Sequence, residues 1–364
     1  MWDAVGDQIA SYYGTDLAEE AVAELRADPM LPTSNHFGVD TFADSVQGTL
    51  LFALRPRPDG GLPHGGCYNL TRLPHGWALA RQTYQPAGQG CPETATPTQF
   101  YLLADGASSA TRLPVTADWV VADGDDTRLW LVTNLGQPDP NSSQVPPQAI
   151  QQVDVTGHPH TPRYRIPDGY TAWQGVAGGA LLVTLAEQGP ADTSLFALWD
   201  PRSGLMLRHY DRVLAATATT IAWVAAGCGP KGCPVHLSDL ASGTDTQVAT
   251  PRGAWANAGA FSPDGRYLAV VFSASVDPTG AATQARVGVI DATKRRLLAV
   301  PGAVMGGGDF WLAAGWSPDG AWLLLSAPAG QHTDQLAAWR PGDRVLHVPR
   351  RQPPTGQYLA PAAG

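Results

Sequence analysis

Short apolar runs, separated by turn-forming residues, follow one another from residue 48 to the C-terminal end of the chain. Some of them, such as residues 129–132, are apolar at every position, which is typical of a strand buried on both faces, whereas others alternate apolar and polar side chains. Taken in pairs, the runs predict β-hairpins, and the hairpins group into six units. In five units the turn of the outer hairpin carries an aspartate, namely Asp105, Asp154, Asp200, Asp239 and Asp291.

These aspartates recur at intervals of 39 to 52 residues, which is the length of a four-stranded sheet with its loops. The recurrence predicts an all-β fold, a β-propeller of six visible four-stranded blades over residues 48–364. Two strand-like pieces are left over, residues 49–54 and residues 356–360. We expect them either to meet and close the ring or to form a partial seventh blade.

The first 47 residues have a different pattern. Trp2, Val5, Ile9 and Tyr12 recur at helical spacing, and a capping box of Asp16 and Glu19 begins a second periodic stretch. Residues 1–47 are therefore predicted to be a short helical N-terminal segment that packs on the rim of the propeller. A stalk or a partner-binding element is the alternative.

One turn sequence occurs twice, as Ser262, Pro263, Asp264 and Gly265 and again as Ser317, Pro318, Asp319 and Gly320. In a tight turn proline presets φ, aspartate bonds the nearby backbone, and glycine adopts the left-handed conformation. We therefore interpret all eight residues as structural. They carry no group placed for chemistry.

The stretch from Phe261 to Ala269 closely resembles the repeat of bacterial TolB-type, WD-repeat-like β-propellers, and the stretch from Trp316 to Leu324 is similar. The motif is complete in two of the six units, and it is more specific for the repeat than for a function. The resemblance implies a ring of six or seven blades that serves as a binding or scaffolding platform in the cell envelope.

Composition narrows the class of protein. A hydrophobic fraction of 44% in regularly spaced runs argues against disorder despite 40 glycines and 32 prolines. A net charge of −9 without a long basic run argues against nucleic acid as a partner. No apolar run reaches the ~20 residues of a transmembrane helix. Lys231 and Lys294 are the only lysines, and this preference for arginine, with abundant Ala, Gly and Pro, indicates a GC-rich bacterial genome.

The four cysteines divide into two local pairs. Cys228 and Cys233 flank a short turn between two apolar runs, where adjacent antiparallel strands would bring them to disulfide distance, and Cys67 and Cys91 both fall in the first unit. Two such pairs favour an oxidising, extracytoplasmic compartment. The residues after Met1 lack a signal peptide, so we expect a leader or envelope anchor ahead of this sequence. Four reduced thiols, or a metal site, are the alternatives.

Catalytic motifs are not recognisable. Residues 227–232 satisfy the G-x-G-x-x-G pattern, but a strand-like run follows them instead of a helix. The Ser-Pro-Asp-Gly turns place glycine one residue too early for a sialidase Asp-box. No G-x-S-x-G nucleophile elbow occurs, so a serine hydrolase site is not predicted.

Histidines and aspartates offer weak candidates for metal binding. His158 and His160 could share a metal from an extended strand, but no acidic residue or cysteine visibly joins them, so we expect exposed loop histidines, and the same holds for His64 and His75. Asp123, Asp125 and Asp126 lack the remaining ligands of a calcium loop, so a solvated turn is expected. No catalytic residue, metal or cofactor is predicted.

The sequence thus favours a non-enzymatic, extracytoplasmic β-propeller that binds a protein or cell-envelope ligand through its loops or central channel. Trp and Tyr side chains at loop tips would carry the affinity. Two alternatives stay open. One is an enzyme with a metal site in the central channel, lactonase-like or lyase-like, which would need acidic or histidine side chains from several blades to converge on the axis. The other is an intracellular scaffold.

Overall fold

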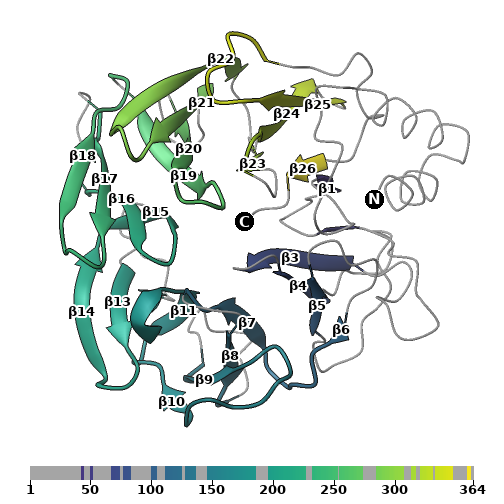
Figure 1. Ribbon diagram of the computed structural model, residues 1–364, viewed down its shortest axis with the longest axis vertical. Coiled ribbons are helices and arrows are strands. Elements are labelled where there is room, and N and C mark those ends of the chain that lie inside the picture. The colour runs from purple at the N-terminus through teal and green to yellow at the C-terminus, as the bar shows by residue number, and fades with distance from the viewer. Residues whose placement is uncertain are drawn as a thin grey trace, which may run out of the picture.

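The computed structural model describes residues 42–44, 50–51, 67–73, 77–82, 100–104, 111–124, 128–136, 146–185, 196–226, 232–252, 254–273, 284–306, 313–316, 320–330, 333–346 and 359–361. Antiparallel sheets follow one another around a central axis in the order of the chain (Figure 1). Most have four strands, the first has five, and the last has three. The chain is a β-propeller.

The first three blades contain strands β2 to β14. Blade 1 consists of β2 (Leu50–Leu51), β3 (Cys67–Leu73), β4 (Trp77–Gln82), β5 (Phe100–Ala104) and β6 (Thr111–Arg112). Blade 2 consists of β7 (Trp119–Ala122), β8 (Leu129–Asn134), β9 (Gln148–Val153) and β10 (Tyr164–Arg165). Blade 3 consists of β11 (Tyr170–Gly175), β12 (Leu181–Leu185), β13 (Phe196–Asp200) and β14 (Leu205–Tyr210).

The last three blades contain strands β15 to β25. Blade 4 consists of β15 (Arg212–Ala216), β16 (Thr220–Val224), β17 (Val235–Asp239) and β18 (Asp245–Val248). Blade 5 consists of β19 (Trp255–Phe261), β20 (Tyr267–Ser273), β21 (Gln284–Asp291) and β22 (Arg296–Gly306). Blade 6 consists of β23 (Ala313–Trp316), β24 (Leu323–Gly330) and β25 (Thr333–Trp339). The predicted repeat of hairpins is confirmed.

The two ends of the chain meet, but not through the predicted pieces. Strand β1 (Phe42–Asp44) pairs with β26 (Leu359–Pro361), so the C-terminal piece joins a strand that lies inside the segment predicted to be helical. Leu50 and Leu51 instead pair with β3 and extend blade 1. The apolar run at 49–54 could not reveal which of two neighbours it would join. The two helices predicted near the N-terminus lie outside the described residues.

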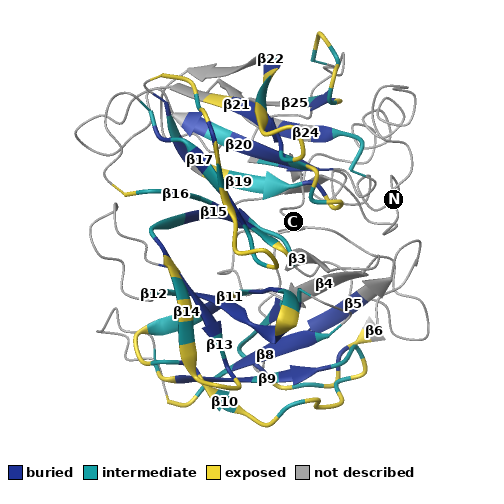
Figure 2. Cartoon of the chain, turned by 60° about the vertical axis from the view of Figure 1, so that its left-hand side comes forward, coloured by how far each residue is buried: buried dark blue, intermediate teal, exposed yellow. Residues whose placement is uncertain are grey.

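Neighbouring blades contact one another through apolar seams, to which both sheets contribute. Strand β8 shows why its run is apolar throughout: Leu129 and Leu131 pack with blade 1, whereas Trp130 and Val132 pack with blade 3. Successive side chains of a strand point to opposite faces, so a strand between two blades needs an apolar residue at every position. Figure 2 shows these buried strands between the exposed outer turns.

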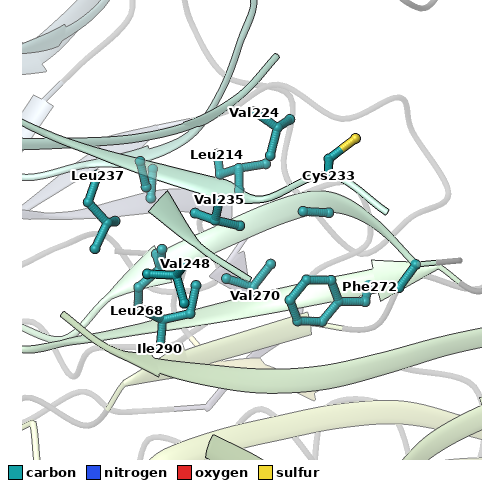
Figure 3. Packing of buried hydrophobic residues seen from close by; sticks show 14 residues of the cluster. Leu214, Val224, Cys233, Val235, Leu237, Val248, Leu268, Val270, Phe272 and Ile290 are labelled. Carbon is teal, nitrogen blue, oxygen red and sulfur yellow. The ribbon is translucent and has the colours of Figure 1, made fainter. Parts of the chain in front are cut away.

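The seam between blades 4 and 5 is drawn in Figure 3. Leu214 and Val235 of blade 4 pack against Val270 and Phe272 of blade 5, and the Cys233 side chain lies at the edge of the same cluster (Figure 3). Burial of large aliphatic side chains stabilises a fold by roughly 1.5–3 kcal/mol each. The seams therefore contribute strongly to the stability of the ring.

The repeated Ser-Pro-Asp-Gly turn joins the two inner strands of blade 5. The buried Ser262 hydroxyl donates to Asp264 Oδ1 at 2.6 Å and accepts a hydrogen bond from the Tyr267 backbone N–H at 2.9 Å. Gly265 has φ of +69°, as Gly320 has in the second copy. Tyr267 stacks on Trp316 of blade 6, with ring centroids 5.7 Å apart. The turn residues therefore shape the hairpin, and the tyrosine that follows them packs between blades.

The outer turns are capped by the repeating aspartates. Asp154, Asp200, Asp239 and Asp291 each accept a hydrogen bond from a backbone N–H two or three residues further on, at 2.7 to 3.0 Å. This local bond closes the turn between the two outer strands, which explains why aspartate recurs there. Asp105 lies outside the described residues.

Replacing Ser262 by alanine should destabilise the protein by about 1–3 kcal/mol, because it removes the acceptor of the partly buried Tyr267 N–H. Urea unfolding followed by tryptophan fluorescence measures the change. Ser203→Ala is the matched control, since the Ser203 hydroxyl also bonds an aspartate, Asp200, but in an exposed turn where water can replace it. Equal losses of stability in the two variants would contradict this assignment.

Candidate functional site: the axial mouth

The innermost strands of the four-stranded blades 2 to 5 begin at the same end of the central axis. Each of these blades starts with its innermost strand and proceeds outward through antiparallel neighbours (Figure 1). A short connection then returns the chain to the axis, and between β14 and β15 it is the single residue Asp211. The first residues of β7, β11, β15 and β19 therefore lie on one face of the ring. We call these residues, Trp119, Tyr170, Arg212 and Trp255, the axial mouth.

Three of the four mouth residues are aromatic, and all four are half-buried. Trp119 and Tyr170 pack against the apolar seam between blades 2 and 3, and Trp255 packs against the seam between blades 4 and 5. One part of each ring is thus held by the core while another part is accessible to solvent. Such side chains are positioned before a ligand arrives, which lowers the entropy cost of binding.

Carboxylates fasten the mouth on two blades. Asp118 precedes Trp119 and accepts a hydrogen bond from the Asn134 backbone N–H at 2.6 Å. Asp211 precedes Arg212 and accepts one from the Ala226 backbone N–H at 2.8 Å. In both blades the acid ties the start of the innermost strand to the end of the second strand. The position of the mouth residue is therefore fixed by the backbone as well as by the seam.

A β-bulge interrupts the innermost strand of blades 3, 4 and 5. The pairing with the second strand shifts at Trp173, at Leu214 and at Asn257. Bulges redirect side chains and are frequent beside functional sites. Leu214 is buried between blades 4 and 5, but Trp173 keeps 38% of its surface exposed. The sequence analysis predicts that aromatic residues at loop tips carry the affinity, whereas this exposed tryptophan lies within strand β11.

A row of aromatic side chains leads from Trp173 across the seam between blades 3 and 4. Trp173 meets Phe196 edge-to-face, with ring centroids 5.2 Å apart, and Tyr210 is the cross-strand partner of Phe196. Trp223 of blade 4 contacts Tyr210 at 5.7 Å, and His236 stacks on Trp223 at 4.2 Å. The row therefore joins the innermost strand of blade 3 to the outer half of blade 4.

Polar groups complete the outer end of this row. His236 Nδ1 lies 3.0 Å from Asp245 Oδ2, and the Ser238 hydroxyl donates to Asp245 Oδ1 at 3.2 Å. The Trp223 indole N–H donates to the same serine at 2.9 Å. Burial raises the pKa of Tyr210. Ser238 is buried and bonds the acid instead of the histidine, so these groups lack the serine–histidine–acid order of a hydrolase triad.

The predicted cysteine pairs fall mostly outside the described residues. Cys233 is disulfide-bonded and precedes β17, which pairs with β16 as expected. Cys228 lies outside the described residues, so its pairing with Cys233 stays a prediction. Cys67 is the first residue of β3, and Cys91 is not described.

The repeat-turn residues lie away from the mouth. Ser262, Pro263, Asp264 and Gly265 join strands β19 and β20 at the end of the axis opposite to Trp255. In the second copy Gly320 is described, and a Cβ on it would lie 3.3 Å from the Pro263 ring. Residues 317–319 lie outside the described part of the chain. The two turns are thus neighbours in space.

The histidine pair has an acidic neighbour that the sequence did not reveal. His158 and His160 are exposed, as predicted, and His160 Nε2 lies 3.4 Å from Asp154 Oδ2 in the outer turn of blade 2. The neighbour comes from the other side of the turn, so linear spacing hides it. Within the described residues, no group of three or more His, Cys, Asp or Glu side chains is arranged to hold a metal ion. His64 and His75 are not described.

Asp123 corrects the expected solvated turn. Its side chain is buried, accepts a hydrogen bond from Gln152 Nε2 at 2.5 Å, and forms an ion pair with Arg128 at 3.8 Å. The carboxylate therefore joins the inner turn of blade 2 to its third strand. Asp125 and Asp126 lie outside the described residues.

Sequence reasoning did not single out the mouth residues. A signal was nevertheless present, because an aspartate stands one or two positions before Trp119, Tyr170 and Arg212, as Asp118, Asp168 and Asp211.

Within the described residues, no helix is long and apolar enough to cross a membrane.

No family model matches the sequence, and no curated protein matches it. Solved structures do match the fold. Acylaminoacyl peptidase from Pyrococcus horikoshii aligns with 84% of this chain at a TM-score of 0.52 and 10% identity. Prolyl oligopeptidase B from Galerina marginata aligns with 97% at 0.50 and 9%. The likeness is one of fold. The chain spans 48% and 55% of the length of these two proteins.

TolB from Acinetobacter baumannii is also among the similar structures. It aligns with 77% of this chain at a TM-score of 0.44 and 15% identity, and the alignment covers 65% of the TolB chain.

The Asp154 turn should make stability depend on pH in the acid range. Hydrogen bonds from Thr156 to the carboxylate lower the pKa of Asp154 from 3.8 to about 2 in the folded protein. Because the folded pKa is depressed, the stabilisation is present above pH ~4 and is lost as the pH falls toward ~2. Melting temperatures of the wild type and Asp154→Asn, compared across this range, should therefore converge in acid. A difference that is independent of pH would contradict the assignment.

Proposed function

We propose that this chain is a non-enzymatic binding module whose axial mouth takes a protein ligand. The observation that carries the proposal is the set of mouth residues, three aromatic side chains and one arginine at equivalent positions of four successive blades. Trp, Tyr and Arg are the residues most enriched at energetic hot spots of protein interfaces. Because the four residues occupy the same position in successive blades, they lie on one face of the ring, where a single protein ligand could contact all of them.

The chemistry of the mouth favours binding over turnover. The nearby acids Asp118 and Asp211 are engaged by backbone N–H groups, so their role is to hold strands in place. The aromatic rings are held by the seams and present apolar area with little conformational freedom to lose. A rigid aromatic rim of this kind supports recognition by shape.

We place the module outside the cytoplasm, and we assign its repeat to the TolB type on the two Ser-Pro-Asp-Gly turns. A disulfide-bonded Cys233 supports an oxidising compartment, since disulfides persist there and are rare in the cytosol. Envelope proteins are the partners that such a compartment offers. The preference for arginine over lysine, with abundant Ala, Gly and Pro, supports a bacterial origin.

Replacement of Trp119 or Trp255 by the photoreactive residue benzoylphenylalanine should yield a discrete cross-linked protein on irradiation with an envelope extract. Val345, which is exposed but follows the last blade, is the control position and should yield none. Once the partner is identified, Trp119→Ala should weaken its binding by about tenfold or more, as for a hot-spot residue.

Two results would count against a binding module. Cross-linking that is the same from Val345 as from the mouth would remove the mouth as the site. Conversion of the captured component to a product, abolished by a chelator, would instead establish an enzyme with a metal in the channel.

The compartment can be tested separately by counting thiols in the denatured, unreduced protein. We expect no free thiol, because all four cysteines are predicted to pair and Cys233 is already bonded. Reaction with a thiol reagent before and after reduction gives the count. Four free thiols in protein isolated from its own host would refute the extracytoplasmic assignment.

A further inference from the structure

The two turns of blade 5 that lie opposite to the mouth along the axis carry four exposed cations. Lys294, Arg295 and Arg296 follow one another where the outer turn enters β22, and Arg266 ends the inner turn between β19 and β20. The pairing of β20 with β21 places both turns at the same end of the blade. A hydrogen bond from the Ala292 backbone N–H to the Arg266 carbonyl, at 2.9 Å, joins them. We call the four residues the basic corner.

The basic corner is built around one buried carboxylate. Asp291 lies opposite Arg296 in the ladder, and Lys294 Nζ lies 3.8 Å from Asp291 Oδ2. Burial opposes ionisation of this acid, but hydrogen bonds from Thr293 and Lys294 and the charges of Lys294 and Arg266 lower the pKa of Asp291. The carboxylate therefore stays charged and offsets the repulsion between the cations.

Positive charge exceeds negative charge at this corner. Asp264 is the other carboxylate of the two turns, and it accepts hydrogen bonds from within its own turn, including one from the Arg266 backbone N–H at 3.1 Å. Among the described residues, no carboxylate forms an ion pair with the side chain of Arg266, Arg295 or Arg296. The equivalent turns of blade 4 contain no cation, and those of blade 3 contain one, Arg202. Blade 5 therefore differs from its neighbours.

Arg295 carries its charge at a position that favours glycine. It is the fifth residue of a turn that begins with a capping aspartate, and Gly204 and Gly243 occupy that place in blades 3 and 4. The φ values of these glycines are +74° and +68°, and that of Arg295 is +53°. Among the described residues, Arg295 is the one non-glycine residue with a positive φ. Such strain is concentrated at functional sites, so the arginine indicates a role beyond closing the turn.

Arg266 is held in place without using its side-chain donors. Its guanidinium carbon lies 4.9 Å from the centre of the Tyr267 ring, and that ring stacks on Trp316 of blade 6. Stacking occupies the flat face of a guanidinium and leaves the N–H groups at its edge available. These donors match the oxygens of a phosphate group in pairs. An exposed and positioned arginine of this kind suits a phosphate ligand.

We propose that the basic corner docks this protein on an anionic membrane surface, through the phosphate groups of the lipids. The four cations lie at the ends of turns, where a flat array of phosphates can approach them together. The net charge of −9 repels the rest of the molecule from such a surface, which fixes the orientation. A nucleic acid would need a longer basic track than one blade offers. Because the corner and the mouth lie at opposite ends of the axis, the docked ring directs its mouth away from the membrane.

Co-sedimentation of the full chain with lipid vesicles tests the docking. Vesicles of phosphatidylcholine with ~30% phosphatidylglycerol should bind the protein, and vesicles of phosphatidylcholine alone should not. Added salt should release it, because screening weakens the attraction between exposed charges. Arg266→Gln and Arg296→Gln should each weaken binding about fivefold. Arg252→Gln is the control, since it removes the same charge from an exposed position at the mouth end of blade 5 and should leave binding unchanged.

Two variants of Arg295 separate charge from backbone conformation. Arg295→Gly removes the charge and adopts a positive φ without strain, so vesicle binding should fall about fivefold while the melting temperature does not fall. Arg295→Lys keeps both the charge and the strain, so binding should be retained. Circular dichroism on heating gives the melting temperatures.

A protein that does not bind the anionic vesicles, or that binds both kinds of vesicle equally, would overturn the proposal. So would a loss from Arg252→Gln as large as that from the corner variants. Tighter binding to duplex DNA than to the vesicles would indicate a nucleic-acid surface instead, and release by inorganic phosphate at constant ionic strength would indicate a site for a single anion. The mouth variants play no part in these measurements, so the binding function is tested independently.

Discussion

Every blade of this protein can bury the second face of its sheet only on the next blade, and the innermost turns are where the blades come closest. The Ala177 backbone N–H of blade 3 donates to the Ala218 carbonyl of blade 4 at 2.7 Å. A Cβ on Gly175 would collide with the Ala122 carbonyl and the Asp123 backbone of blade 2, so only glycine fits there. These backbone contacts fix the distance between neighbouring blades near the axis, and the apolar side chains of the seams pack the space between the sheets farther out.

The contacts between neighbouring blades also make the axial mouth rigid. Each mouth residue begins a strand whose far end is held in the ring of inner turns, and its near end is tied by a seam or by Asp118 or Asp211. A side chain mounted in this way has little freedom to lose when a ligand binds. Solvent exposure and stable positioning therefore coexist in Trp119 and Trp255, which would otherwise be either buried or mobile.

The fold could be predicted from the sequence because local chemistry and the repeat agree. Ser262, Asp264 and Gly265 specify one hairpin, and aspartates such as Asp200 cap the outer turns through bonds to residues two or three positions away. Ring closure could not be predicted in the same way. Residues 42–44 pair with residues 359–361, but neither short run has a sequence feature that indicates which strand it pairs with.

The site was hidden for a related reason. Trp119, Tyr170, Arg212 and Trp255 come together only because four separate strands begin at one end of the axis, and no linear spacing expresses that. Asp154 and His160 meet across a turn, and Asp123 turns inward to Arg128 although its neighbours in sequence are acidic. A site that takes one residue from each of several blades can be recognised only from the three-dimensional arrangement of the blades.

The aromatic row connects the innermost strand of blade 3 with its outermost strand, from Trp173 through Phe196 to Tyr210, at the last position of β14. Phe196 and Tyr210 are buried in the seam between blades 3 and 4, so the row is held by both blades. A ligand at the mouth would therefore meet side chains that are already fixed by packing, and its binding would cost little conformational entropy.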